Sequence, residues 1–158
     1  MTMKKTFLSI AACLLSAFSV LTSCSVEIEA NGNGALDGFW HLEQVDTLAT
    51  GGKADLSSRR LFWGVQAKLV SVRDFDKNDS GYYLRFAQTS DSLTLSSPYA
   101  NNWHENEQNT GGDVPVTDAA VLAPFGINNL TEGFCKETLK GGTMVLRSKR
   151  LRLHFKKF

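Results

Sequence analysis

Three histidines, His41, His104 and His154, are the side chains of this chain best suited to moving protons near neutral pH or to holding a metal ion. They are far apart in the sequence, and none belongs to a His-Glu-x-x-His pair. The chain also has no Gly-x-Ser-x-Gly elbow, no Gly-x-x-x-x-Gly-Lys phosphate loop and no Cys-x-x-Cys pair. Because no nucleophile, base and orienting group can be assembled, we expect no enzyme, no metal and no cofactor.

A second candidate for chemistry is the segment Trp103-His104-Glu105-Asn106-Glu107, which places an aromatic ring beside an imidazole and two carboxylates. An aromatic ring offers a stacking surface, and carboxylates accept hydrogen bonds from hydroxyl groups. The composition therefore suits contact with a cation or a sugar at the rim of a domain. The alternative is a solvated loop whose Trp103 folds over the end of the domain.

The overall composition is that of an ordinary soluble domain. The chain has 158 residues, of which 42% are hydrophobic and 21% charged, and its formal net charge is +1. This length favours one domain, and a nearly neutral chain gives no electrostatic reason to bind a large polyanion. We therefore expect no nucleic acid among the partners.

The amino-terminal residues have the layout of an export signal. Lys4 and Lys5 precede an apolar run at 7–21 that is broken only by Ser and Thr. The run is shorter than a typical membrane-spanning helix. It ends at Leu21-Thr22-Ser23-Cys24, where two small residues precede a cysteine.

The sequence Leu21-Thr22-Ser23-Cys24 resembles the lipobox of bacterial lipoproteins. The resemblance implies a signal peptide at 1–23 and a Cys24 whose sulfur carries a diacylglyceryl group after cleavage, so that two or three acyl chains hold the protein on the membrane. A plain secreted protein or a short transmembrane anchor is the alternative. Removal of Cys13 and acylation of Cys24 would leave Cys135 with no partner for an intramolecular disulfide.

Residues 24–35 are polar and rich in Gly and Asn, which predicts a flexible tether before a domain at 36–158. Glu27 and Glu29 follow Cys24 closely, and such acidic residues in Bacteroidetes-like lipoproteins are associated with export to the outer face. We expect a cell outer membrane location, lipid-anchored and periplasmic or surface-facing.

Short segments of period two, separated by turn residues, predict an antiparallel all-β domain. The predicted strands are residues 39–46, 60–73, 82–88, 93–97, 133–139, 143–148 and 151–157. Residues 98–115 are expected to form a long loop, and 116–126 are ambiguous between helix and strand. About eight meandering strands close into an up-and-down β-barrel. A two-sheet sandwich is the main alternative.

Gly38-Phe39-Trp40 resembles the Gly-x-Trp signature that opens the first strand of lipocalins. The whole mature chain is similar to the Bacteroidetes-type lipocalin-like lipoprotein family, which has related segments at Phe125-Gly126-Ile127 and near the carboxyl terminus. The resemblance implies an antiparallel lipocalin-like barrel whose end is closed by Trp40 beneath a basic side chain. We expect Arg147, Arg150 or Arg152 to supply that cation.

Two functions remain open at this point. In the first, the barrel is a non-catalytic binding module for a small apolar or amphipathic ligand, contacted by Trp40, Trp63, Phe86 and Trp103. In the second, these inward-facing residues form a packed core, and the barrel is a protein-interaction or structural component with an envelope protein partner.

The carboxyl-terminal residues 136–158 contain eight basic side chains and the single acid Glu137. Such a basic edge suits anionic membrane headgroups. The alternative is a solvated face that prevents edge-to-edge strand pairing.

Overall fold

The computed structural model describes residues 32–77, 81–102 and 113–158. In these ranges the chain forms antiparallel strands and two short 3-10 helices, η1 (Gly34–Leu36) and η2 (Ala119–Phe125). The strands are β1 (Gly38–Thr47), β2 (Gly52–Asp55), β3 (Leu61–Gln66), β4 (Leu69–Asp74), β5 (Tyr82–Gln88), β6 (Ser92–Ala100), β7 (Val114–Pro115), β8 (Glu132–Lys140), β9 (Thr143–Arg147) and β10 (Leu151–Lys157). Among the described residues, no helix is long and apolar enough to cross a bilayer.

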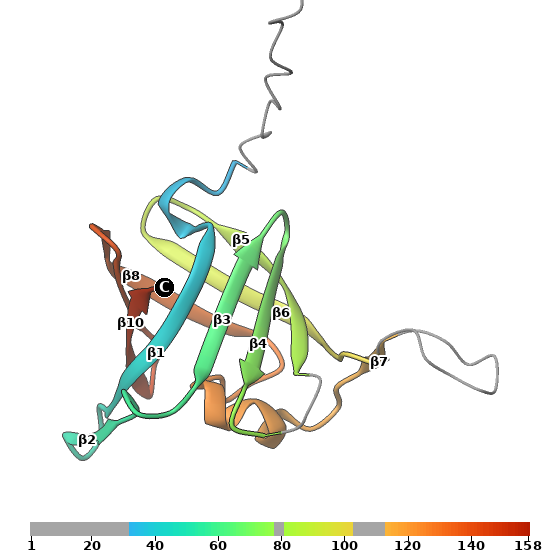
Figure 1. Cartoon of the computed structure of the whole chain (residues 1–158), viewed down its shortest axis with the longest axis horizontal. Coiled ribbons are helices and arrows are strands. Elements are labelled where there is room, and N and C mark those ends of the chain that lie inside the picture. Colours follow the sequence, from blue (N-terminus) through green and yellow to red (C-terminus); the bar gives the residue numbers. More distant parts are fainter. Residues whose placement is uncertain (1–31, 78–80, 103–112) are drawn as a thin grey trace, which may run out of the picture.

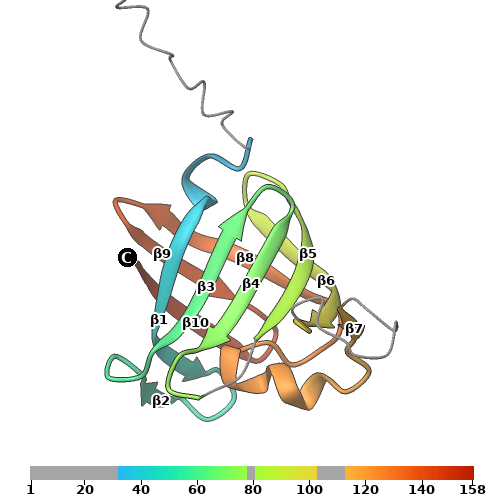
Figure 2. The same ribbon diagram turned by 45° about the vertical axis from the view of Figure 1, so that its right-hand side comes forward.

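Eight of these strands form a closed barrel (Figure 1), in the order β10-β9-β8-β6-β5-β4-β3-β1, and the pairing of β1 with β10 completes the circle. The turned view in Figure 2 shows the strands inclined to the barrel axis. β2 pairs with the far end of β1, and β7 pairs with the end of β6. The predicted antiparallel barrel of about eight strands is confirmed, and the two-sheet sandwich is excluded.

The prediction of one long strand at 60–73 is wrong, because the chain reverses at Ala67 and Lys68. Val65 pairs with Val70 and Gln66 with Leu69, which leaves a two-residue turn. Ala67 has a φ of 53°, a left-handed conformation that such turns require but that glycine or asparagine usually supplies. The side-chain amide of Asn33 donates a hydrogen bond of 2.7 Å from its Nδ2 atom to the Ala67 carbonyl and holds this turn.

Other differences from the sequence prediction lie in the connecting segments. β2 was not predicted, and β6 continues to Ala100 instead of ending at Ser97. Residues 119–125 of the ambiguous segment form η2, in which the Asp118 carboxylate caps the first turn. β2 forms a hairpin with the preceding β1, whereas the last residues of β6 pair with Tyr82 and Tyr83 of β5 and with β7.

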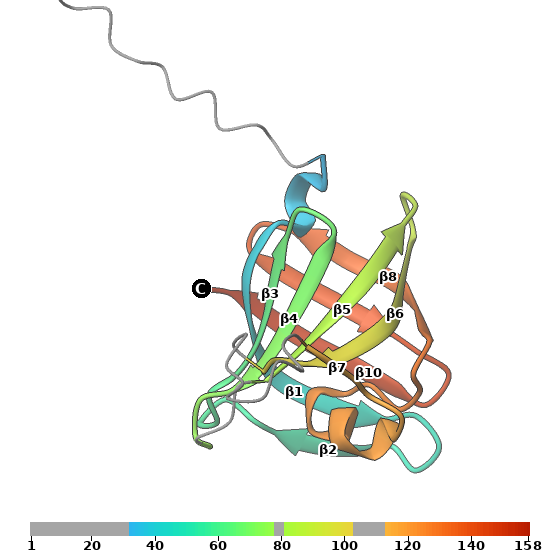
Figure 3. The same ribbon diagram turned by 90° about the vertical axis from the view of Figure 1, so that its right-hand side faces the viewer.

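Two tryptophans fix the ends of the barrel. The Trp40 indole donates a hydrogen bond of 2.8 Å to the Leu36 carbonyl in η1. The Trp63 indole donates one of 3.2 Å to the Phe125 carbonyl in η2. Figure 3 shows η1 and η2 at opposite ends of the barrel, so each helix closes one end.

The cation over Trp40 is Lys157 and not Arg147, Arg150 or Arg152. The Lys157 ammonium lies 5.1 Å from the centre of the indole ring. A Cβ at Gly38 would lie 2.5 Å from the Lys157 Cε atom, so the glycine leaves room for this side chain. β10 pairs with β1 so that Lys157 is opposite Trp40, whereas Arg152 is opposite Asp46.

A carboxylate network joins the chain before β3 to the chain after β4. Asp76 accepts hydrogen bonds from the Arg60 backbone amide at 2.8 Å and the Arg60 Nε atom at 2.9 Å. Arg59 donates to Asp76 at 3.1 Å and to the buried Asp74 at 3.0 Å. The pKa of Asp76 is thereby lowered to about 2, chiefly by the Arg60 amide and guanidinium.

Gly126→Ala should destabilise the barrel much more than Gly141→Ala. Both glycines have positive φ, 80° and 61°, so each substitution carries about 1 kcal/mol of backbone strain. An added Cβ at Gly126 would also lie 2.5 Å from the Cδ2 atom of Leu153, a fully buried side chain, whereas Gly141 faces open space. We expect a total loss of about 3 kcal/mol for Gly126→Ala by urea unfolding. Equal losses in the two variants would contradict the packing of η2 against β10.

Asp76→Asn should reduce the acid sensitivity of folding. A carboxylate whose folded pKa of about 2 lies below its ordinary value of 3.8 stabilises the protein above pH 4 and loses that contribution as the pH falls toward 2. Urea midpoints at pH 7, 4 and 2.5 should therefore fall less steeply in Asp76→Asn, from a lower starting value at pH 7. Leu48→Ser, which changes an exposed side chain and removes no carboxylate, is the control and should keep the parent slope. If the urea midpoint of Asp76→Asn fell with pH as steeply as that of the parent, the proposed role of the network would be refuted.

Candidate functional site

Three of the predicted ligand contacts, Trp40, Trp63 and Phe86, face the barrel interior. Trp40 and Trp63 are at most 1% exposed, and Phe86 is 9% exposed. All three belong to one hydrophobic cluster with the inward residues of the other strands. Trp103 and Cys24 lie outside the described residues.

The described inward-facing side chains pack on one another. Leu122 and Phe125 of η2, with Ile127 after it, are buried in the same cluster as Trp63 and Phe155. The rings of Trp63 and Phe155 are 4.9 Å apart between centroids, and those of Trp63 and Phe134 are 6.0 Å apart. Of the two interpretations of the inward residues, this arrangement favours a packed core.

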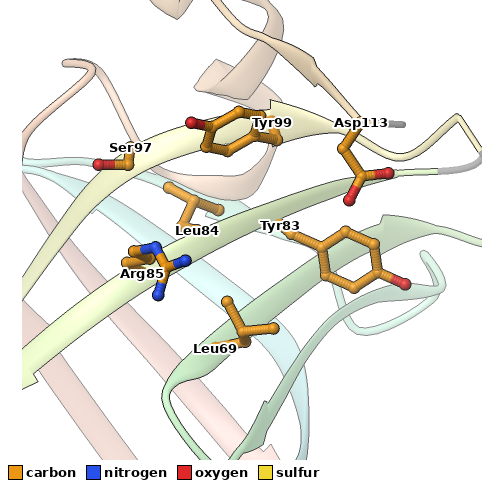
Figure 4. A pocket seen from close by; sticks show the side chains of 7 residues that line it. All are labelled: Leu69, Tyr83, Leu84, Arg85, Ser97, Tyr99 and Asp113. Atoms are coloured by element: carbon orange, nitrogen blue, oxygen red, sulfur yellow. The ribbon is translucent and has the colours of Figure 1, made fainter. Parts of the chain in front are cut away.

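A groove of about 520 Å³ lies on the outside of the barrel wall formed by β4, β5 and β6. Its described lining combines two tyrosine rings, apolar side chains and two opposite charges (Figure 4): Leu69, Tyr83, Leu84, Arg85, Ser97, Tyr99 and Asp113. We call this the outer groove. It was not predicted from the sequence, because the expected ligand contacts were all placed on the inward face of the strands.

The alternation along β5 puts Leu84 inside the barrel and leaves Tyr83 and Arg85 on the outside. Leu69 is exposed beside them because β4 pairs Leu69 with Arg85 and turns Val70 inward. The part of the outer groove formed by β4 and β5 therefore results from the regular alternation of inward and outward side chains.

A β-bulge in β6 forms the opposite wall of the outer groove. Arg85 pairs with Ser96 but Tyr83 pairs with Tyr99, so β6 contains one extra residue at this point. Ser97 has a φ of 49°, the left-handed conformation expected at such a bulge. The extra residue keeps Tyr99 beside Tyr83 on the outer face and turns Pro98 into the barrel.

The polar groups of the outer groove lie at its ends. Figure 4 shows the Arg85 guanidinium at one end of the groove and the Asp113 carboxylate at the other, with the Tyr99 ring between these ends and the Tyr83 ring on the Asp113 side. Asp113 accepts a hydrogen bond of 3.2 Å from the Asn102 amide, and Asn101 donates one of 3.3 Å to the Tyr83 hydroxyl. The rings can stack on an apolar or planar group, while Arg85 can pair with an anionic one.

The two histidines of the described residues, His41 in β1 and His154 in β10, each have a different hydrogen-bond partner. His41 makes a 2.6 Å hydrogen bond with the Arg59 carbonyl, and His154 makes one of 2.9 Å with Asp46. The His154 contact lowers the pKa of the Asp46 carboxyl. Within the described ranges, no three His, Cys, Asp or Glu side chains lie close enough to hold a metal ion.

The basic residues near the carboxyl terminus are partly neutralised by Glu137. Its carboxylate accepts hydrogen bonds of 2.7 Å from both Arg147 and Arg152. Arg152 in particular lowers the pKa of Glu137, and Arg147 contributes less. This end of the barrel is therefore less cationic than the count of basic residues suggests.

Comparison with solved structures finds the same fold. A lipocalin-like protein from Bacteroides uniformis superposes with a TM-score of 0.56 at 19% identity, over 79% of this chain and 100% of that one. An uncharacterized protein from Bacteroides eggerthii gives a TM-score of 0.53 at 20% identity, over 77% of this chain and 98% of that one. No curated protein matches the chain.

The model of one protein family, described as a lipocalin-like domain, matches residues 19–158. The match covers most of the chain and includes every strand of the closed barrel. With its Gly-x-Trp opening, its closed antiparallel barrel and this family match, the chain belongs to the lipocalin-like domain family.

Proposed function

We propose that the chain is a lipid-anchored, non-catalytic binding module of the bacterial cell envelope, which holds a small amphipathic ligand in the outer groove. The observation that carries this proposal is that Tyr83 and Tyr99, which are opposite each other in the β5–β6 pairing, line one groove together with Arg85 and Asp113. A lipocalin-like barrel is generally a binding fold without catalytic activity, which agrees with this use.

The chemistry of the outer groove selects the class of ligand. The two tyrosine rings and Leu69 offer an apolar surface, and Arg85 offers a charge-assisted hydrogen bond to a carboxylate, sulfonate or phosphate. A ligand with a planar or apolar body and one anionic end satisfies both features.

The anchor in this proposal is Cys24 in its lipobox-like setting. The described chain begins at Gly32 next to η1, at the end of the barrel opposite η2 (Figure 1). The outer groove is on the outside of the β4–β5–β6 wall, and its Leu69 follows the Ala67 turn that Asn33 holds. A module tethered there can keep the groove open to the periplasm or to the cell exterior.

The second candidate function is a protein-interaction or structural role in the envelope, with an envelope protein as partner. The close packing of Trp40, Trp63 and Phe86 favours this candidate over binding inside the barrel, because a packed core needs no ligand. It differs from the first candidate in requiring no small molecule at the outer groove.

The outer groove can be tested with two fluorescent probes on residues 25–158, a segment that contains the whole described core and the β1–β10 closure. The probes are 1-anilinonaphthalene-8-sulfonate, which is anionic, and N-phenyl-1-naphthylamine, which is neutral. Tyr99→Ala should weaken both probes, because each has rings to stack, whereas Arg85→Gln should weaken only the anionic one, by about tenfold. Leu48→Ser, at an exposed apolar position in the β1–β2 turn, is the control and should change neither. Unchanged probe affinity in Tyr99→Ala and Arg85→Gln would favour the interaction role instead.

The anchor can be tested with Cys24→Ala in the full chain, expressed in a bacterial host that processes lipoproteins. The variant should lose both acylation and signal cleavage, because the alanine has no sulfur to form the thioether. Mass spectrometry of the amino-terminal peptide and membrane fractionation measure both effects. Cys13→Ala is the matched control and should be acylated normally. An unmodified Cys24 in the parent chain would rule out the lipid anchor.

A further inference from the structure

A group of aromatic rings lies on the outer face of the barrel, away from the core and the outer groove. Phe39 and Phe62 stack with ring centroids 4.6 Å apart. Phe75 and Phe158 each approach both of these rings edge-on, at centroid distances between 5.5 and 6.2 Å. We call Phe39, Phe62, Phe75 and Phe158 the outer aromatic cluster.

Strand alternation explains why these rings face outward. Trp40 in β1 and Trp63 in β3 point into the barrel, so the neighbouring Phe39 and Phe62 point away from it. β1 and β3 lie side by side in Figure 1, and Phe39 is opposite Gly64. The Phe39 ring lies over Gly64, at ordinary van der Waals distance from where a Cβ would stand.

The rings of the outer aromatic cluster differ in their exposure to solvent. Phe62 is 8% exposed, whereas Phe75 is 38% and Phe158 is 87% exposed. Neither Phe75 nor Phe158 belongs to the hydrophobic core of the barrel. Contiguous exposed apolar surface of this kind marks a site of interaction.

The charged groups beside the cluster present cations to the solvent. The Arg60 and Lys77 side chains are 63% and 59% exposed, while the Asp74 carboxylate that pairs with Lys77 is 1% exposed. Arg73 lies over the Phe75 ring at 5.3 Å from its centroid. Among the described residues, the surface therefore combines phenyl rings with exposed guanidinium and ammonium groups, beside the partly exposed acids Asp76 and Glu43.

We propose that the outer aromatic cluster docks on an anionic phospholipid membrane, with Phe75 and Phe158 at the boundary between headgroups and acyl chains. Arg60 and Lys77 would then contact lipid phosphates. Aromatic rings flanked by basic side chains are the composition of surfaces that bind bilayer interfaces. The anionic lipid supplies the complementary charge, whereas a neutral protein surface would match only the rings.

The position of the cluster along the chain agrees with this occupant. Phe39 is the second residue of β1, so the cluster begins where the tether joins the barrel. The chain from Cys24 to Phe39 can span at most about 50 Å. The inference rests on the proposed envelope function and deepens it. A lipid-anchored Cys24 would keep the outer aromatic cluster within reach of the membrane, and docking of the cluster would then orient the barrel.

The experiment is co-sedimentation of residues 25–158 with phospholipid vesicles. This segment contains every described core residue and the β1–β10 closure, and it lacks Cys24, so its vesicle binding does not depend on acylation. Vesicles of phosphatidylcholine alone are compared with vesicles that also contain phosphatidylglycerol. We expect binding to the anionic vesicles that weakens with salt.

Phe75→Ser combined with Phe158→Ser should lower the partition coefficient on anionic vesicles by about tenfold, because the exposed rings no longer enter the interface. Arg60→Gln combined with Lys77→Gln should reduce the preference for anionic over neutral vesicles. Leu48→Ser combined with Val121→Ser removes exposed apolar side chains elsewhere and should leave the partition coefficient unchanged. Thermal unfolding of each variant checks that the barrel is intact.

Absence of vesicle binding by the parent segment would overturn the docking proposal, as would binding that the Phe75 and Phe158 substitutions leave unchanged. Self-association in sedimentation velocity that these substitutions abolish, without vesicle binding, would assign the cluster to a second copy of the chain and would also overturn it. Failure of the anchor proposal is separately visible, as an unmodified Cys24 in the full chain.

Discussion

The pairing of β1 with β10 is the constraint on which the rest of the structure depends, because it turns a meander of strands into a barrel with an inside and an outside. Trp40 stands at this seam. Its indole binds the Leu36 carbonyl of η1, and the Lys157 side chain from β10 lies across its ring. Gly38 makes the crossing of Lys157 sterically possible. The two residues of the Gly-x-Trp signature therefore act together. Gly38 leaves room for the Lys157 side chain, and Trp40 closes the end of the barrel beneath it.

In the proposed function, the ligand binds on the outer wall, because the described inward residues form a packed core. At the end opposite η1, Leu122 and Phe125 of η2 are buried, and the described inward side chains pack against one another. The outer groove and the outer aromatic cluster both follow from strand alternation, since each outward strand residue has an inward neighbour in the core. In the proposed arrangement, the cluster faces the membrane and the groove presents Tyr83, Tyr99 and Arg85 to a ligand. Hydrogen-bonded strands hold these two sectors at a fixed angle, so docking of one would also orient the other.

The sequence by itself determined the features that depend on local pattern. Alternating residues predicted an antiparallel barrel of about eight strands, and Gly38-Phe39-Trp40 indicated its family. Local pattern fails where a residue's neighbours come from another strand. The turn at Ala67 contains no glycine that would predict it from the sequence. Only the pairing of β3 with β4 shows that residues 60–73 form two strands.

Tertiary structure alone decided the cation over Trp40 and the position of the outer groove. Several basic residues lie near the carboxyl terminus, but the β1–β10 register brings Lys157, and not an arginine, to the indole. The groove likewise exists because the bulge at Ser97 keeps Tyr99 beside Tyr83. The physical reason is the same in both cases. A period of two in the sequence fixes which face of a strand a side chain occupies, whereas strand register and bulges fix which side chains meet across the sheet.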